Sequence, residues 1–196
     1  MANQSEIKYN RLLEKAEELF LEQGYKAVSM DTIASKAGIS KMTIYKYFPS
    51  KEELFLKIIS MMMEKYTAII ESEMTKFSNT IDKIDYVLSF SLEASQDYSF
   101  AFYKDIMDNP YIRNRVLEEK TKYSNMFFEK IIREGIEKGE IRKCDIASMT
   151  EILSVIIEAL THNYFDKINN RDELEVKAAI LYDFLKYGLF GGNEVK

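Results

Sequence analysis

The sequence predicts an all-α protein. Its 196 residues include only 7 Gly and 2 Pro, whereas strand-rich sandwiches and barrels need frequent turn residues. Glu, Lys, Leu, Ile and Ala, which suit helices, recur along the chain. Apolar residues make up 46% of the sequence, which is enough to fill a core and argues against disorder. We expect a three-helix head, residues 1–51, followed by a helical-bundle body, residues 52–196.

The first helix is expected at about residues 6–23. Its apolar residues recur at the spacing of one helix face, and Gly24 can take the left-handed conformation that ends a helix. The apolar stripe consists of Leu12, Leu13, Ala16, Leu19 and Phe20.

Two short helices follow, with a tight turn between them. Ser29 fits the N-cap of a helix that runs to about residue 36, and Ser40 fits the N-cap of the next, at about residues 41–47. Gly38 tolerates positive φ in the turn, and small Ala34 lets the two helices cross closely. This is the pattern of a helix-turn-helix unit.

A capping box opens the fourth helix. Pro49 ends the third helix, and Ser50 with Glu53 forms the S-x-x-E pattern of a helix N-terminus. The fourth helix should reach about residue 77 and couple head and body, because no low-complexity linker separates them. Further helices are expected at about residues 81–97, 99–107, 111–138, 145–167 and 172–190.

Positive charge gathers in the head although the net charge of the chain is -5. Residues 1–51 carry eight Lys or Arg against six Asp or Glu, and residues 52–196 carry 19 against 26. Between residues 26 and 51, five Lys face one acidic residue, Asp31. Affinity for a polyanion depends on where the cations lie, so the head can bind nucleic acid.

The third helix presents a face that suits the major groove of DNA. When Ile44 points inward, Met42 and Lys46 point outward and Tyr45 and Thr43 flank them. Lysine can reach guanine or phosphate, methionine can touch a thymine methyl, and tyrosine can donate to phosphate. The alternative is a small surface helix that simply displays polar side chains. Ser40 and Lys41 complete the candidate site at the positive N-terminus of this helix.

The segment from Gly24 to Leu54, with S-M-D-T-I-A-S-K-A-G-I-S-K-M-T-I-Y-K-Y-F-P-S-K-E-E-L at its centre, resembles the signature of TetR-family repressors over roughly residues 8–55. The resemblance implies phosphate contacts and base-reading positions in this segment. Many members carry Gly where this chain has Met42, which affects how closely the turn approaches the bases. The implied phosphate contacts are Ser29, Lys41, Tyr45, Tyr47 and Lys51, and the implied base-reading positions are Met42 and Lys46.

The resemblance also implies a homodimer formed by the last two long helices. Residues 152–160 are apolar almost all round, as expected for a helix buried on two sides. The final helix offers an apolar stripe at helical spacing, and the alternative is that both helices are purely core. The stripe consists of Leu174, Ala178, Leu181 and Leu185.

The body is dense in aromatic residues and methionines, which can line adaptable apolar cavities but more often fill a core. Placement on the expected helices selects five candidates for the pocket of a small-molecule effector. These are Tyr66, Phe90, Tyr103, Tyr123 and Phe127.

Several functional classes are excluded or disfavoured. A single cysteine, Cys144, and a single histidine, His162, leave no disulfide framework and no Cys/His zinc site. His162 can face a ligand, the dimer seam or solvent. No phosphate-binding glycine motif or nucleophile-base pair is present, so we expect no catalytic residues, no metal and no cofactor. The charged N-terminus and the lack of a long apolar run predict a cytoplasmic protein without a membrane segment.

These observations predict a DNA-binding transcriptional regulator. We expect a repressor that leaves a palindromic operator when a small apolar or amphipathic effector binds the body. A rival interpretation is a protein-interaction module whose helix-turn-helix no longer binds DNA.

Overall fold

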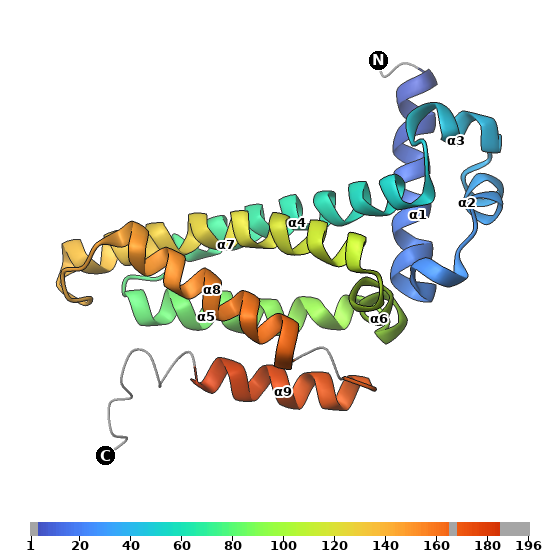
Figure 1. Cartoon of the computed structure of the whole chain (residues 1–196). Helices are drawn as coiled ribbons and strands as arrows, with labels where there is room; N and C mark the ends of the chain where they lie inside the picture. Colours follow the sequence, from blue (N-terminus) through green and yellow to red (C-terminus); the bar gives the residue numbers. More distant parts are fainter. Residues whose placement is uncertain (1–3, 165–167, 185–196) are drawn as a thin grey trace. The chain divides into compact units, whose positions relative to one another are not determined.

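The computed structural model describes residues 4–164 and 168–184, which form helices joined by short connections (Figure 1). The prediction of an all-α chain is confirmed, and most predicted helix ends lie within a few residues of those observed. The predicted ends of the last two helices, residues 165–167 and 185–190, lie outside the described residues. The helices are α1 (Gln4–Ala27), α2 (Met30–Ala37), α3 (Lys41–Tyr47), α4 (Lys51–Met74), α5 (Thr80–Ala94), the 3-10 turn η1 (Ser95–Asp97), α6 (Phe100–Asp108), α7 (Pro110–Lys138), α8 (Ile146–Tyr164) and α9 (Arg171–Asp183).

The chain forms two compact units. Unit 1 comprises residues 1–64 and 97–117, and unit 2 comprises residues 65–96 and 118–196. Helices α4 and α7 therefore supply residues to both units. The boundary predicted after residue 51, between the head and the body, stays a prediction. Among the described helices, none is long and apolar enough to cross a membrane.

Unit 1 is built around aromatic side chains that come from α1, α4 and α6. The ring of Phe55 on α4 lies edge-on to Phe20 of α1, with 4.9 Å between ring centroids. It also lies 5.4 Å from the ring of Phe102 on α6. Ile33 of α2 and Ile44 of α3 are fully buried as well, so the two short helices of the head close over an apolar interior.

Helix α1 contains a kink at Gly24, where the sequence predicts that the first helix ends. The backbone there has φ 82° and ψ 171°, a region open to glycine, and a helical turn continues to Ala27 beyond it. The kink lets the backbone approach α6. The N–H of Lys26 donates to the Asp105 carboxylate at 2.8 Å, and the N–H of Ser99 donates to the carbonyl of Leu21 at 2.8 Å.

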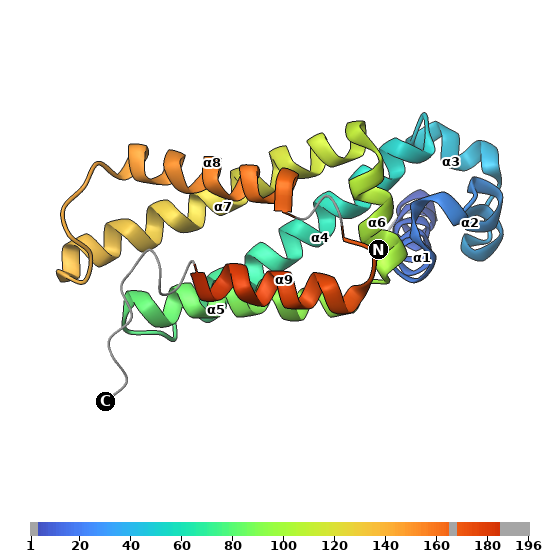
Figure 2. The ribbon, with the colours of Figure 1, turned by 60° about the horizontal axis from the view of Figure 1, so that its bottom comes forward.

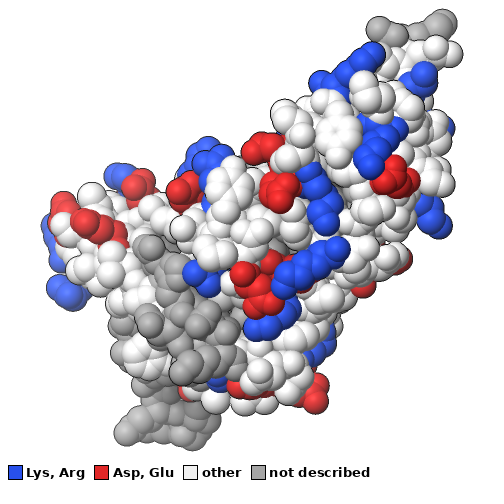
Figure 3. Space-filling model, turned by 45° about the vertical axis from the view of Figure 1, so that its right-hand side comes forward, with Lys and Arg blue, Asp and Glu red and all other residues white. Residues whose placement is uncertain are grey.

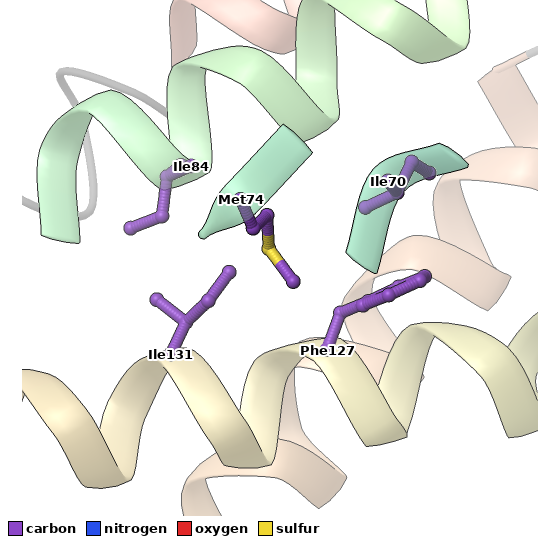
Figure 4. Packing of buried hydrophobic residues seen from close by; sticks show 5 residues of the cluster. All are labelled: Ile70, Met74, Ile84, Phe127 and Ile131. Carbon is purple, nitrogen blue, oxygen red and sulfur yellow. The ribbon is translucent and has the colours of Figure 1, made fainter. Parts of the chain in front are cut away.

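The core of unit 2 joins α4, α5 and α7 (Figure 4). Met74 of α4 points between Ile131 and Phe127, which project from successive turns of α7. Helix α9 packs along α5 (Figure 2). We call the five buried residues of this core the body cluster: Ile70, Met74, Ile84, Phe127 and Ile131.

Candidate nucleic-acid interface

The turn between α2 and α3 has the hydrogen bonds that the sequence predicts. The Ser29 hydroxyl caps α2 by accepting the N–H of Thr32 at 3.0 Å, and the Ser40 hydroxyl caps α3 by accepting the N–H of Thr43 at 3.1 Å. Gly38 takes the left-handed conformation, with φ 63° and ψ 39°. These contacts fix the angle at which α3 leaves the turn.

The outer face of α3 carries the side chains that the helical pattern places there. Ile44 is fully buried, whereas Met42 is 70% exposed and Tyr45 is 41% exposed. Lys46 is exposed as well. The expectation that Met42 and Lys46 point outward is therefore confirmed, and a thioether, a phenol and an ammonium share one accessible surface.

Lys41 lies at the start of α3 and is held by an acidic neighbour from α2. Its ammonium is 2.7 Å from the Asp31 carboxylate, and hydrogen bonding to that carboxylate raises the pKa of Lys41. Both side chains are exposed, so the pair is weak and a phosphate can replace Asp31 as the partner of Lys41.

Tyr47 and Thr43 are less accessible than Tyr45. The Tyr47 hydroxyl is 2.9 Å from the Ser5 hydroxyl, and its ring meets the ring of Tyr9 on α1 with 5.0 Å between centroids. The Thr43 hydroxyl is 2.8 Å from the Ser40 hydroxyl. Contacts of these residues with DNA stay predictions, and in the free protein their polar groups already have partners.

Lys51 occupies a half-buried site at the start of α4. Its ammonium donates to the carbonyls of Tyr25 at 2.7 Å and Val28 at 3.0 Å, and it lies 4.1 Å from the centroid of the Tyr25 ring. Burial lowers the pKa of Lys51. The side chain therefore ties the end of α1 to α4, a structural role that the sequence does not indicate, and its predicted phosphate contact stays a prediction.

The surface of the head mixes basic and uncharged side chains. Figure 3 shows Lys and Arg atoms recurring over the part of the molecule that carries α1 to α3, with fewer acidic atoms between them. The exposed lysines of α2 and α3 are Lys36, Lys41 and Lys46. Because phosphate contacts dominate the affinity of proteins for DNA, this distribution favours a polyanion.

Four of the five predicted pocket residues lie in unit 2. The rings of Tyr66 and Phe90 meet edge-on, with 5.6 Å between centroids, and Phe127 belongs to the body cluster. Phe90 and Tyr123 are partly buried and pack against that cluster. Tyr103 lies in unit 1, where its ring is 5.9 Å from that of Phe100. Ligand contact by any of the five stays a prediction.

Helices α8 and α9 expose an apolar surface. The apolar stripe predicted on the final helix faces the interior of the protein, because Leu174 and Ala178 are buried. Leu185 lies outside the described residues. A different set of apolar side chains on these helices is more than half exposed. We call this set the apolar face: Ile152, Val155, Val176 and Ile180.

The sequence predicts no metal site and leaves the surroundings of His162 open. Among the described residues, no three His, Cys, Asp or Glu side chains are placed to hold a metal ion. The side chain of His162 lies outside the described part of the chain.

Sequence reasoning missed two side chains that the structure places at informative positions. Arg11 donates to the carbonyl of Gly38 at 3.3 Å, and Asp105 holds the backbone after the α1 kink. Both are charged residues within amphipathic helices, where a sequence pattern alone suggests contact with solvent.

Comparison with known proteins agrees with the helix-turn-helix geometry. The profile of bacterial regulatory proteins of the tetR family matches residues 12–58. The chain is 30% identical over 138 residues, 68% of this chain and 72% of the other, to the uncharacterized HTH-type transcriptional regulator YhgD of Bacillus subtilis. It is 29% identical over 145 residues, 71% of this chain and 74% of the other, to the fatty acid metabolism regulator protein of the same species.

A solved structure has the same fold. The transcriptional regulator FadR from Bacillus subtilis, crystallised with stearoyl-CoA, superposes with a TM-score of 0.65 at 21% identity, covering 92% of this chain and 98% of that one. With the confirmed outer face of α3 and the match to YhgD, these findings show that the chain belongs to the TetR family of bacterial transcriptional regulators, which bind DNA and are not enzymes.

Proposed function

We propose that the chain is a homodimeric repressor that leaves a palindromic operator when a small apolar or amphipathic effector binds unit 2. The observation that carries the DNA-binding part is the accessible surface of Met42, Tyr45 and Lys46 on a helix fixed by a capped turn. An exposed α3 inserts into the major groove, with base edges in reach of its outer residues.

The effector site that we propose is lined by the partly buried aromatic residues around the body cluster. Tyr66 and Phe90 contact each other, and Tyr86 lies 5.9 Å from Phe90 between ring centroids. Aromatic walls with phenol groups suit a long apolar ligand that has a few polar atoms. Because a relative regulates fatty acid metabolism and a structural neighbour holds stearoyl-CoA, we propose a ligand with a long acyl chain.

The proposed dimer contact is the apolar face on α8 and α9. Val155 is 58% exposed and Val176 is 59% exposed. Contact of these apolar side chains with water is unfavourable, and a second copy of the chain that covers both would remove it. The symmetry of a homodimer matches that of a palindromic operator, since each half-site then receives one α3.

We propose that helix α4 couples effector binding to DNA binding. It supplies Leu54 and Phe55 to the core of unit 1, and Ile70 and Met74 to the body cluster of unit 2. A continuous helix carries displacement along its axis because a sharp kink would require backbone hydrogen bonds to break. By linkage, an effector that weakens DNA binding by a given factor is itself bound more weakly by that factor when DNA is present.

The experiment that tests DNA binding is fluorescence anisotropy with the DNA upstream of the protein's own gene and with scrambled DNA of equal length. We expect tight binding to the first only, falling roughly 10³- to 10⁵-fold between about 50 and 200 mM salt if about 6 to 10 phosphates are contacted. The double variant Tyr45→Ala/Lys46→Ala should lose this binding. Lys143→Ala, which removes an exposed lysine of unit 2, should retain it.

The rival protein-interaction module predicts a different result. Its binding would respond little to salt, and the double variant would bind DNA as weakly as the parent chain. If the upstream DNA is not bound, selection from random-sequence DNA provides the decisive comparison. Failure to enrich any sequence there would refute the proposed regulator.

A further inference from the structure

An acidic side chain lies against a lysine on the surface that we propose binds DNA. Asp31 belongs to the first turn of α2, and its carboxylate lies 2.7 Å from the ammonium of Lys41 on α3. The contact joins two different helices, through residues that are ten positions apart in the chain. Asp31 is also the sole acidic residue between residues 26 and 51, which contain five lysines. The one negative charge of this segment is thus placed on a lysine that is predicted to bind phosphate.

The Asp31–Lys41 pair contributes little to the structure of the turn between α2 and α3. The Asp31 side chain is 71% exposed and that of Lys41 is 45% exposed, so water screens both charges. The hydroxyl caps of Ser29 and Ser40 already fix the ends of the two helices. A structural benefit of Asp31 is the favourable interaction of its charge with the N-terminus of α2, which does not involve Lys41.

DNA must displace the Asp31 carboxylate before a phosphate can bind Lys41. A phosphate that accepts a hydrogen bond from the Lys41 ammonium takes the place of Asp31, so DNA binding loses the ion pair. The freed carboxylate then remains near a phosphate of like charge, and their repulsion lowers the affinity further. Every DNA sequence presents the same phosphates, so both losses apply to operator and non-operator DNA alike.

We infer that Asp31 competes with DNA phosphate for the Lys41 ammonium and thereby limits the affinity of the head for DNA. This inference rests on the proposed function, and it concerns the strength of phosphate contact and not the reading of bases. A DNA-bound head exchanges the carboxylate for a phosphate, and a free head restores the ion pair. Removing the charge of Asp31 should therefore tighten DNA binding, although the same change removes a favourable charge from the N-terminus of α2.

The test uses Asp31→Asn, which keeps the size of the side chain and removes its charge. Fluorescence anisotropy of the full chain with scrambled DNA, at about 50 to 200 mM salt, measures phosphate affinity without knowledge of the operator. We expect Asp31→Asn to bind about 3- to 30-fold more tightly than the parent chain. The plot of log affinity against log salt should become steeper by up to about 0.9 for each head. Asp31→Glu keeps the charge and should bind as the parent chain does.

Glu18 supplies a matched control in the same unit. Its carboxylate lies 2.7 Å from the ammonium of Lys15 on α1, and its side chain is 53% exposed. Glu18→Gln removes the same charge but frees no lysine of α2 or α3, so DNA affinity should change by less than about 2-fold. A double-mutant cycle with Lys41→Met tests the route of the effect. Most of the gain from Asp31→Asn should vanish when Lys41 is already replaced.

Thermal unfolding followed by circular dichroism gives an independent readout. Asp31→Asn should lower the thermal midpoint slightly, because α2 loses a favourable charge, while DNA binding becomes tighter. A purely structural role of Asp31 predicts instead that stability and DNA affinity fall together. If Asp31→Asn does not fold, Asp31→Ser removes the same charge and also suits the first turn of a helix.

The outcomes separate this inference from the proposed function. Unchanged or weaker DNA binding by the folded Asp31 variant refutes the competition, whereas DNA binding by the parent chain leaves the proposed function in place. An equal gain for Glu18→Gln, or a gain that persists in full with Lys41→Met, also refutes it, because net charge alone would then explain the effect. If neither the parent chain nor Asp31→Asn binds any DNA at about 50 mM salt, the proposed DNA binding is wrong and the inference falls with it.

Discussion

Replacing Gly24 with alanine should destabilise unit 1 severely, for two reasons that the structure separates. The backbone at Gly24 has φ 82° and ψ 171°, where a side-chain-bearing residue costs about 1–3 kcal/mol. A Cβ would also lie 2.7 Å from the Asp105 carboxylate and 3.1 Å from the backbone of Ala101. Forcing extra volume into a packed site costs about 1–3 kcal/mol more. The expected total is therefore about 2–6 kcal/mol.

Urea unfolding followed by circular dichroism measures this loss, and a second glycine with positive φ but no close neighbours provides the comparison. Gly139 has φ 74°, and a Cβ there meets nothing within 4 Å. Gly139→Ala should therefore cost only about 1–2 kcal/mol, the price of backbone strain. In the double variant Gly24→Ala/Asp105→Ala, the carboxylate is gone while the contact with Ala101 remains. The combined loss should fall short of the sum of the single losses by about 0.5–2 kcal/mol.

Two results would contradict this reasoning. Equal losses for Gly24→Ala and Gly139→Ala would show that the approach of α6 to Gly24 adds nothing. Strict additivity of Gly24→Ala and Asp105→Ala would show that the carboxylate does not limit the space at this kink.

Three further predictions concern other contacts. The hydroxyl of Tyr25 donates to Glu52 at 2.5 Å, which lowers the pKa of Glu52, and burial together with Glu52 raises the pKa of Tyr25. This hydrogen bond should therefore make its full contribution to the stability of the folded state between pH 4.5 and pH 10.0. That contribution should be lost as pH falls through the folded pKa of Glu52, or as pH rises through the folded pKa of Tyr25. The free energy of unfolding of the parent chain should accordingly exceed that of Tyr25→Phe by about 1–2 kcal/mol at neutral pH. A difference between the two proteins that stays constant down to about pH 3 would contradict this prediction. Lys51→Met should cost about 1–3 kcal/mol in urea unfolding by removing the donor to two backbone carbonyls, and the salt slope of DNA binding falls by about 1 only if Lys51 also contacts phosphate. Val155→Asp should give monomers in light scattering, whereas Ile81→Asp, which replaces a comparably exposed residue on α5, should leave the dimer intact; dimers for both variants would exclude the apolar face as the interface.

The helix-turn-helix could be predicted from sequence because its determinants are local. Hydroxyl caps at Ser29 and Ser40 act within three residues of their partners, and Gly38 is required by one backbone conformation. The orientation of Met42 and Lys46 follows from the helical repeat once Ile44 is assigned to the core. None of these inferences depends on which distant segment packs where.

Contacts between distant segments could not be predicted from the sequence pattern. The sequence suggests that Lys51 is one more exposed cation of a basic head. In the structure it donates to the carbonyls of Val28 and Tyr25, which lie 23 and 26 residues earlier in the chain. The helix after Gly24 continues because α6 supplies an acceptor 79 residues away for the N–H of Lys26. On α9, an apolar stripe and a second apolar face have similar composition, and only packing against α5 decides which is buried.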